Sequence, residues 1–354
     1  MREIRDLINI SKYAGSRYDL VQAGGGNSSV KLEDGTMLVK ASGILLSEME
    51  ENKGIAIVDK KTVSEIVCKK EICDCDVKKE REKLAAEIIR NSSLNDEKPS
   101  IETILHSLLG KYVLHVHPLA VNIVTARTCW KDILNSLFRS GEIAMVSYRT
   151  PGIDLALELA AELDNYAVCP QIIFLQNHGL IVHSNEPDEI RTLTEYAVQS
   201  VENYLKIDMS SYKSVTAVSD LIFSVVQERF AVHLSEDTVL CGALTEHKEL
   251  FFVKPFCPDK LVYCGVRSLE IKGPGDAASI KEYIRQYKDV PRVILMGKRI
   301  YIISKNIRKA KEAEDVLKFH IATLSCGADD INYLTDDEIE YLSNWDQEKY
   351  RQIL

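Results

Sequence analysis

His115 and His117, separated by a single residue, carry the strongest chemical signal in the sequence. Alternate side chains of a β-strand point to the same face, so the two imidazoles would project toward one ion. A third histidine, His178, directly follows a second apolar segment. Three histidines that leave a fourth position open are the ligand set of a catalytic zinc ion. The alternative interpretation is that the His115–His117 pair is a coincidence or a hydrogen-bonded pair in the core.

An acidic residue, Glu102, stands one helical turn before His106. It follows Ser100, and a serine with an acid two residues later is typical of a helix start, with Ser100 as the N-cap and Glu102 facing the positive end of the helix dipole. This structural role is the default interpretation of both residues. The other histidines are expected at the surface or, hydrogen-bonded, in the core: His106, His183, His233, His247 and His320.

A run of three glycines, Gly24 to Gly26, leads into Asn27 and Ser28. Glycine lets backbone N–H groups approach an anion closely, and the asparagine and serine side chains add donors, so the run could cradle a phosphate. No G-K-[ST] sequence follows, which excludes a Walker loop. A plain tight turn is the alternative.

Alternating strand and helix patterns up to about residue 205 supply the scaffold for these residues. Strands are predicted at 29–32, 37–40, 54–58, 113–116 and 171–175, the first two as a hairpin across Asp34-Gly35. Helices are predicted at 78–90, 101–109 and 188–205. This order indicates an α/β layered domain with a central mixed or antiparallel sheet.

A second, smaller α/β domain is predicted after a polar linker at 208–219, which places the two domains at residues 1–210 and 215–354. Helices are predicted at 221–231 and 307–324, and a hairpin joins 292–296 with 300–304. Apolar strand candidates surround Val239, Phe252 and Val262. The sequence offers no argument for what this domain contributes.

Composition excludes several functional classes. The 354 residues are 45% hydrophobic and 27% charged with a net charge of −9, which is typical of a globular protein and lacks the basic surface that binds nucleic acid. Apolar runs are far shorter than the roughly 18 residues that span a bilayer, so no membrane partner is expected. Nine scattered cysteines and an N-terminus without an export signal predict reduced thiols in the cytoplasm.

Several separated motifs follow one another over residues 24–183. They are Gly26-Asn27-x-Ser29, Ala41-Ser42-Gly43, Ser100-x-Glu102-x-x-x-His106, His115-x-His117-Pro118, Tyr148-x-Thr150-Pro151-Gly152 and Asn177-His178-Gly179-Leu180. With these motifs in this order, the chain resembles the class II sugar-phosphate aldolase family, whose fold is shared by the head domain of adducin.

The resemblance implies a role for each of these sites. His115, His117 and His178 would bind one Zn²⁺ per subunit, and Glu102 would handle the proton at the nucleophilic carbon, a task suited to a carboxylate whose apolar site brings its pKa toward neutrality. The substrate phosphate would be held by neutral donors at Gly26, Asn27, Ser42, Gly43 and Ser100.

Two departures from the family pattern concern the phosphate. Ile101 stands where relatives often have a second Ser or Thr, and glycines stand where a Thr often precedes the Gly-Asn pair. The tyrosine that can donate a proton from a neighbouring subunit has no match, because Tyr148 belongs to another motif. The family commonly forms tetramers, so a homo-oligomer, a tetramer or a dimer, is expected.

The second domain shows a narrower likeness. Its matching segments are Phe256-Cys257-Pro258-Asp259-Lys260-Leu261-Val262, Pro291-Arg292-Val293-Ile294-Leu295, the helix through Ala310, Ala313, Asp315 and His320, and the tail Trp345-x-x-Glu348-x-Tyr350-Arg351. They are similar to the aldolase half of bifunctional rhamnulose-1-phosphate aldolase/short-chain dehydrogenase proteins. The dehydrogenase half has no counterpart in this sequence.

The resemblance therefore implies a zinc-dependent lyase that splits a ketose 1-phosphate into dihydroxyacetone phosphate and an aldehyde. Two alternatives use the same metal site, a pentulose-phosphate 4-epimerase and a sugar-phosphate dehydratase. A third is a non-catalytic binding protein like the adducin head, which lacks the metal histidines.

Overall fold

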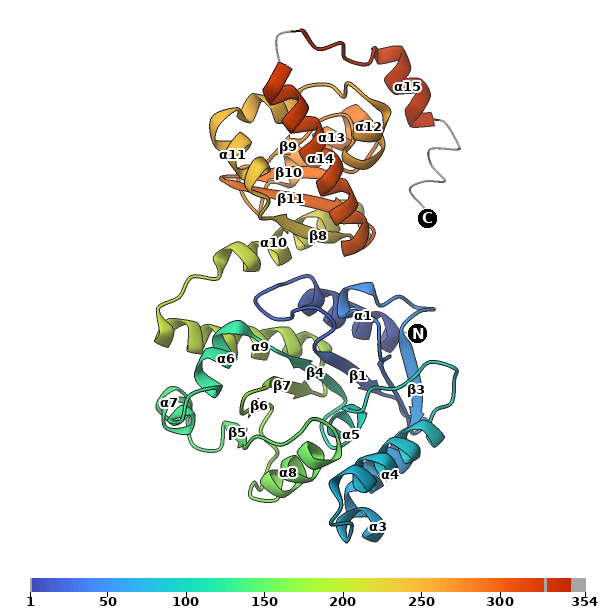
Figure 1. Ribbon diagram of the computed structural model, residues 1–354, viewed down its shortest axis with the longest axis vertical. Helices are drawn as coiled ribbons and strands as arrows, with labels where there is room; N and C mark the ends of the chain where they lie inside the picture. Colours follow the sequence, from blue (N-terminus) through green and yellow to red (C-terminus); the bar gives the residue numbers. More distant parts are fainter. Residues whose placement is uncertain (1, 328–329, 345–354) are drawn as a thin grey trace. The chain divides into compact units, whose positions relative to one another are not determined.

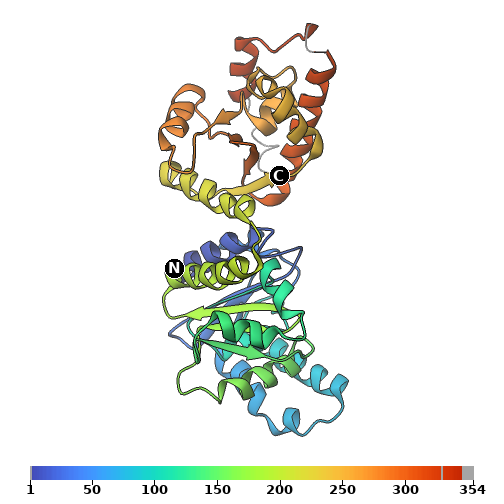
Figure 2. The ribbon, with the colours of Figure 1, turned by 90° about the vertical axis from the view of Figure 1, so that its left-hand side faces the viewer.

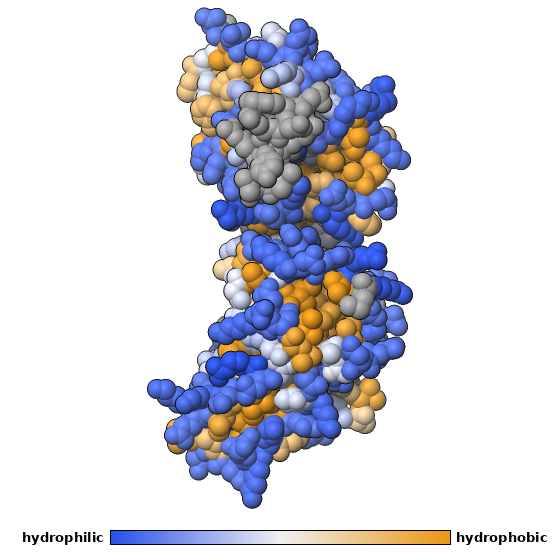
Figure 3. All heavy atoms as spheres, turned by 90° about the vertical axis from the view of Figure 1, so that its right-hand side faces the viewer, coloured by the Kyte–Doolittle hydropathy of each residue, from blue (hydrophilic) through white to orange (hydrophobic). Residues whose placement is uncertain are grey.

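The computed structural model describes residues 2–327 and 330–344 and divides into two compact units, residues 1–209 and 210–354. The tail motif expected at Trp345, Glu348, Tyr350 and Arg351 lies outside the described residues. None of the helices in the described ranges combines the length and the hydrophobicity that a bilayer span requires. The molecular face in Figure 3 is largely hydrophilic, and its hydrophobic side chains form separate patches.

A seven-stranded sheet with the order β3-β2-β1-β4-β7-β6-β5 forms the centre of the first unit. All neighbouring strands are antiparallel except β5 and β6, which are parallel. The strands are β1 (Asn27–Lys31), β2 (Thr36–Lys40), β3 (Ile55–Asp59), β4 (Tyr112–Val116), β5 (Ile143–Val146), β6 (Ile172–Leu175) and β7 (Gly179–Ser184). This mixed sheet confirms the predicted fold class and the β1–β2 hairpin.

Helices cover both faces of this sheet, so the unit has three layers (Figure 1). One face carries α1 (Arg2–Gly15), α6 (Leu119–Thr125), α7 (Trp130–Leu137) and α9 (Pro187–Leu205). The other carries α2 (Lys60–Ser64), α3 (Lys70–Cys73), α4 (Lys78–Asn91), α5 (Thr103–Ser107) and α8 (Ile153–Leu163).

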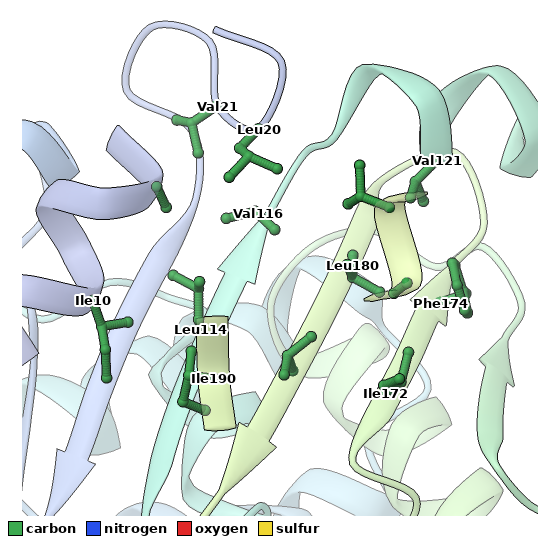
Figure 4. Close-up of a cluster of buried hydrophobic side chains, with 14 of the residues drawn as sticks. Ile10, Leu20, Val21, Leu114, Val116, Val121, Ile172, Phe174, Leu180 and Ile190 are labelled. Atoms are coloured by element: carbon green, nitrogen blue, oxygen red, sulfur yellow. The ribbon is translucent and has the colours of Figure 1, made fainter. Parts of the chain in front are cut away.

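Strand β4 shows how the strand period separates the two cores. Leu114 and Val116 enter the cluster beneath α1 and α9, which Figure 4 shows together with Leu180 and Phe174. Val113 enters the cluster on the opposite face, with α5 and α8. Because side chains alternate along a strand, residue 115 projects to the same side as residue 113. The sequence alternation therefore directs His115 toward α5.

A four-stranded sheet, in the order β8-β11-β10-β9, forms the centre of the second unit. Its strands are β8 (Ala231–Ser235), β9 (Leu269–Glu270), β10 (Val293–Met296) and β11 (Arg299–Ser304). One face packs against α11 (Thr238–Glu246), α12 (Pro258–Cys264) and α14 (Ile307–Gly327), and the other against α10 (Ser210–Val226) and α13 (Ala277–Tyr287) (Figure 2). A further helix, α15 (Asp336–Asn344), contacts α12. The predicted β10–β11 hairpin and the long helix α14 are confirmed.

Several expectations for the second unit are wrong. The boundary between the two units lies inside the predicted linker 208–219, but most of that segment is helical, because α10 begins at Ser210. The helix predicted at 221–231 is the end of α10 followed by β8. Val239 and Val262 lie in α11 and α12, and Phe252 ends a 3₁₀ helix (Lys248–Phe252). A short apolar run cannot by itself distinguish a strand from a buried helix turn. The side chain of Asp237 accepts hydrogen bonds from the first N–H groups of α11 and starts that helix.

Candidate active site

Three histidine side chains meet at one end of the seven-stranded sheet. The Nε2 atom of His115 lies 3.1 Å from Nε2 of His117 and 3.3 Å from Nε2 of His178. His115 is completely buried, whereas the other two are partly exposed, so the cluster is accessible to solvent on their side. The structure thus brings together all three histidines that the sequence singled out.

The sheet register explains why residues so distant in sequence converge. His115 lies on the central strand β4 and pairs with Ile181 of the antiparallel strand β7. The turn that enters β7 contains Asn177, in a left-handed conformation with φ of 54°, and His178. Asparagine tolerates this conformation better than most residues. The turn before β7 therefore lies beside the end of β4.

Glycines allow the close approach of the neighbouring segments. A Cβ atom on Gly179 would lie 2.2 Å from the carbonyl oxygen of Val116, and one on Gly25 would lie 2.7 Å from Nδ1 of His117. Gly26 has a φ of +75°, and a Cβ there would lie 2.9 Å from the carbonyl oxygen of His115. Gly25 and Gly26 are consequently required for packing against the histidine strand, a function that the sequence did not reveal.

The carboxylate of Glu102 completes the cluster. Its Oε1 lies 3.2 Å from Nε2 of His178 and 3.7 Å from Nε2 of His115, and the side chain is 13% exposed. Burial acts to raise the pKa of Glu102, but the neighbouring histidines, including the hydrogen bond from His178, outweigh it and hold the pKa below its usual range. This shift favours the ionised carboxylate, and the acid–base role of Glu102 stays a prediction.

The histidine cluster has the geometry of a metal site. Metal–nitrogen bonds of about 2.0–2.1 Å in a tetrahedron separate two ligand nitrogens by roughly 3.3 Å, close to the two measured separations. Burial lowers the pKa of His115 far below normal and that of His117 as well, which favours the neutral form that ligates metals. Nδ1 of His115 donates to the carbonyl oxygen of Leu180 at 3.2 Å and leaves Nε2 free to bind.

Gly26 and Asn27 lie at the same end of the sheet as the histidines. Asn27 pairs with His115 across β1 and β4. Its side chain is buried, and its Oδ1 accepts a hydrogen bond from the N–H of Ser28 at 3.1 Å. Since β1 and β2 are antiparallel, the start of β1 lies next to the end of β2.

The remaining expected phosphate residues lie on two adjacent segments. Ser42 and Gly43 follow β2 and are exposed, and the half-buried Ser100 precedes α5. An antiparallel bridge between Ala41 and Pro99 joins the two segments. The bridge joins the segments of Ser42 and Ser100, and a phosphate held by these residues stays a prediction.

Ser100 is not the N-cap of the helix that follows it. The capping position of α5 is Glu102, whose side chain makes no capping hydrogen bond and points to the histidines instead. The hydroxyl oxygen of Ser100 accepts a hydrogen bond from the N–H of Glu102 at 3.3 Å, so it shapes the turn that precedes the helix. A helix does start at this pattern, but the side chain of Glu102 contacts the histidines instead of capping the helix.

Two buried polar side chains near the site differ from what the sequence indicated: Lys40 was not identified, and the hydrogen bonding predicted for His106 is wrong. Lys40, at the end of β2, donates from its ammonium to the carbonyl oxygens of Ile44 at 2.7 Å and Ala41 at 3.4 Å, and so lies beneath the loop that carries Ser42. A lysine inside an apolar strand is the signal that could have revealed it. His106 was expected to be fully hydrogen-bonded, yet only its Nδ1, 2.8 Å from Oγ of Ser29, has a partner among the described residues.

A family profile matches this part of the chain. The family described as Class II Aldolase and Adducin N-terminal domain matches residues 5–205, which is more than half of the sequence. The chain belongs to this family. The match includes every residue of the cluster, and it confirms the resemblance that the sequence motifs indicated.

Solved structures with a similar fold include members of the class II aldolase family. The N-terminal class II aldolase domain of a conserved protein from Thermoplasma acidophilum is 25% identical over 57% of this chain and 93% of that chain, with a TM-score of 0.49. YgbL, a putative aldolase/epimerase/decarboxylase from Klebsiella pneumoniae, is 18% identical over 59% and 90%, with a TM-score of 0.42. An L-fuculose-1-phosphate aldolase from Thermus thermophilus is 15% identical over 58% and 94%, with a TM-score of 0.40. No curated protein matches the sequence.

Proposed function

We propose that the protein is a zinc-dependent lyase that cleaves a ketose 1-phosphate, such as rhamnulose 1-phosphate, into dihydroxyacetone phosphate and an aldehyde. The observation that carries this proposal is the convergence of three imidazole Nε2 atoms and one carboxylate at the open end of the sheet. The adducin-like alternative loses support, because a purely structural domain has no need for three imidazoles and a carboxylate in one cluster.

His115, His117 and His178 would hold the zinc ion, which supplies a Lewis acid that stabilises negative charge on substrate oxygens. Glu102 would exchange the proton at the carbon that becomes the nucleophile. As an ionised carboxylate, it accepts this proton in the condensation direction. In the cleavage direction the hydroxyl group of the carbon that becomes the aldehyde loses its proton as the carbon–carbon bond breaks. Glu102 would take up this proton, directly or through water, and then give it to the carbon left behind.

The phosphate would be bound by donors on adjacent segments: Gly26, Asn27, Ser42, Gly43 and Ser100. Ser42, Gly43 and Ser100 offer backbone N–H groups and hydroxyls at or near the surface, whereas Gly26 and the side chain of Asn27 are buried. Lys40 beneath the loop adds a positive charge that favours an anion there. Ile101, 52% exposed, contributes no polar atom from its side chain.

A panel of ketose phosphates tests the proposal. We expect stoichiometric zinc in the purified or reconstituted protein, and triose phosphate released from a ketose 1-phosphate in a zinc-dependent manner. Formation of an epimer from a pentulose phosphate, or loss of water from a sugar phosphate, would replace the lyase with one of the two enzymes that use the same metal site. Absence of zinc after reconstitution would favour the binding protein.

The assembly state is a separate expectation. We propose a homo-oligomer, a tetramer or a dimer, which light scattering on the purified chain would measure directly. A monomeric mass at working concentrations would contradict it.

A further inference from the structure

His117 is held in place differently from the other two histidines. His115 lies inside the sheet, paired with Asn27 of β1 and with Ile181 of β7. His117 lies beyond the last pair of β4 and β7, and its N–H donates instead to the carbonyl oxygen of Leu20 at 2.9 Å. Its main-chain position therefore depends on the loop at 16–22.

A second main-chain bond ties the same loop to the chain just past His117. The N–H of Leu119, at the start of α6, donates to the carbonyl oxygen of Asp19 at 2.9 Å. The side chains of Leu20 and Val21 enter the hydrophobic cluster near Val116, at the end of β4 (Figure 4). The carbonyl groups of Asp19 and Leu20 thus hold the segment that carries the imidazole of His117.

The loop is organised by a buried arginine. The side chain of Arg17 is 1% exposed, and its Nε donates to Oδ1 of Asp19 at 3.0 Å while Nη2 donates to Oδ2. The side chain of Asp19 is completely buried. The carbonyl group of Arg17 accepts hydrogen bonds from the N–H groups of Leu20 and Val21 at 3.1 and 3.0 Å. Arg17 therefore fixes both the side chain of Asp19 and the turn that presents the carbonyl of Leu20.

The same guanidinium anchors the loop to a long helix. Nη1 of Arg17 donates to Oε1 of Glu195 on α9, and the hydroxyl of Tyr13 donates to the same oxygen at 2.6 Å. The ring of Tyr13 lies 5.6 Å from the guanidinium carbon. A forked, planar cation makes three such bonds at once, and a lysine cannot reproduce that geometry.

We propose that Arg17 is a positioning residue, which holds His117 for metal binding through the side chain of Asp19 and the main chain of Leu20. The proposal rests on the proposed metal site and adds a residue outside the ligand set to it. Partners that orient metal ligands commonly change metal affinity by 10- to 100-fold when mutated, because a ligand must be held to within about half an ångström.

Two arginine-to-lysine variants test this role. Arg17→Lys keeps the positive charge and loses the planar, forked guanidinium group. The matched control is Arg81→Lys. Arg81 lies in the same unit and also donates hydrogen bonds to a carboxylate, that of Asp154, and to a carbonyl group, that of Cys75. Neither Arg81 nor its partners contact the loop at 16–22 in any described interaction. Zinc dissociation constants would be measured by competition with a chromophoric chelator, and amide hydrogen exchange would be measured on both metal-free proteins.

We expect Arg17→Lys to bind zinc 10- to 100-fold more weakly and to exchange the amides of residues 117–119 faster than the parent protein. Arg81→Lys should match the parent in both measurements. An unchanged zinc affinity in folded Arg17→Lys overturns the proposal, and so does an equal loss in Arg81→Lys. A weaker affinity with unchanged exchange at residues 117–119 also overturns it, because the proposed route runs through that main-chain bond.

A milder variant keeps the test decisive if Arg17→Lys does not fold. Glu195→Ala removes one hydrogen-bond acceptor of the guanidinium and preserves the Arg17–Asp19 pair, so a smaller loss of zinc affinity with faster exchange at residues 117–119 is expected. Parental values in this variant would then refute the positioning role. If the parent protein binds no zinc, the proposed function fails, while the exchange comparison still reports whether Arg17 holds this segment.

Discussion

The chemistry of the site depends on one carboxylate whose surroundings keep it charged. Glu102→Gln preserves the size of the side chain and removes the charge. We expect turnover of the cleaved ketose phosphate to fall by about 10² to 10⁴, the usual contribution of a general acid–base residue. Zinc content should stay at the parental level, because the three imidazole nitrogens remain.

The control for this variant is Glu65→Gln, a surface glutamate whose side chain is 54% exposed and whose partner is Lys61. It should leave turnover unchanged. Full activity in Glu102→Gln would remove Glu102 from the acid–base role, and loss of zinc in that variant would make it a ligand instead.

His320 of α14 shows the cost of burying an imidazole without partners. Neither of its ring nitrogens has a hydrogen-bond partner among the described residues, and the ring stacks on Phe256 with centroids 4.9 Å apart. Burial, followed by the positive charge of Lys260, lowers the pKa of His320 to about 3. Between pH 3 and the unfolded value near 6.5 the unfolded chain binds more protons, so stability falls as the pH falls through this range.

From pH 6.5 to pH 5, His320 should reduce the free energy of unfolding by about 2 kcal/mol. His320→Leu removes both the proton linkage and the unpartnered polar atoms, so it should stabilise the protein by roughly 1–3 kcal/mol at pH 7 and by more at pH 5. Urea titrations at the two pH values would measure the difference. A variant that is less stable than the parent at pH 5 would show that His320 has a partner in solution.

At the scale of elements, the contact between β4 and β7 determines where two of the ligands lie. Gly179→Ala would place a methyl group 2.2 Å from the carbonyl oxygen of Val116, so β7 would have to move away and take His178 with it. We expect a loss of stability of about 1–3 kcal/mol, the usual cost of overpacking, together with weaker zinc binding. Thermal unfolding and chelator competition would measure the two effects.

Gly242→Ala is the matched control, because a Cβ at this position in α11 meets nothing within 4 Å. Alanine there should stabilise the helix by up to about 1 kcal/mol. Equal destabilisation by the two substitutions would contradict the close approach of β7 to β4.

The elements of the first unit that the sequence predicted are those whose patterns are local. The alternation in 113–116 and the turn at Asp34-Gly35 determine strands and a hairpin without reference to the rest of the chain. The spacing of His115 and His117 likewise predicted that their imidazoles lie together, and His178 joins them in the structure. The loop at 16–22 carried no such signal, because the burial of Arg17 is decided by its tertiary contacts with Asp19 and with α9. The short apolar runs of the second unit failed for the same reason, since helix and strand differ there only in what they pack against.

At the scale of the whole molecule, the proposed metal site belongs to one unit only. All three histidines and Glu102 lie within residues 1–209, and the second unit has hydrophobic clusters of its own. A ligand stabilises the structure that binds it, by about 2.7 kcal/mol when its free concentration is 100 times its dissociation constant. Zinc should therefore stabilise the first unit and leave the second unchanged.

Removal of the metal by a chelator should consequently lower one unfolding transition by roughly 5–10 °C, given a shift of about 2–4 °C per kcal/mol for a unit of this size. The His320→Leu substitution identifies the other transition, because it should raise the melting temperature of the second unit alone. Differential scanning calorimetry of the parent and of this variant, each with and without chelator, separates the two effects. If the chelator and the substitution shift the same transition, either the two units unfold together or the metal is not held by the histidines of the first unit. A chelator titration of His178→Ala decides between these two cases. The chelator should leave the unfolding temperature of this variant unchanged if the histidines hold the metal.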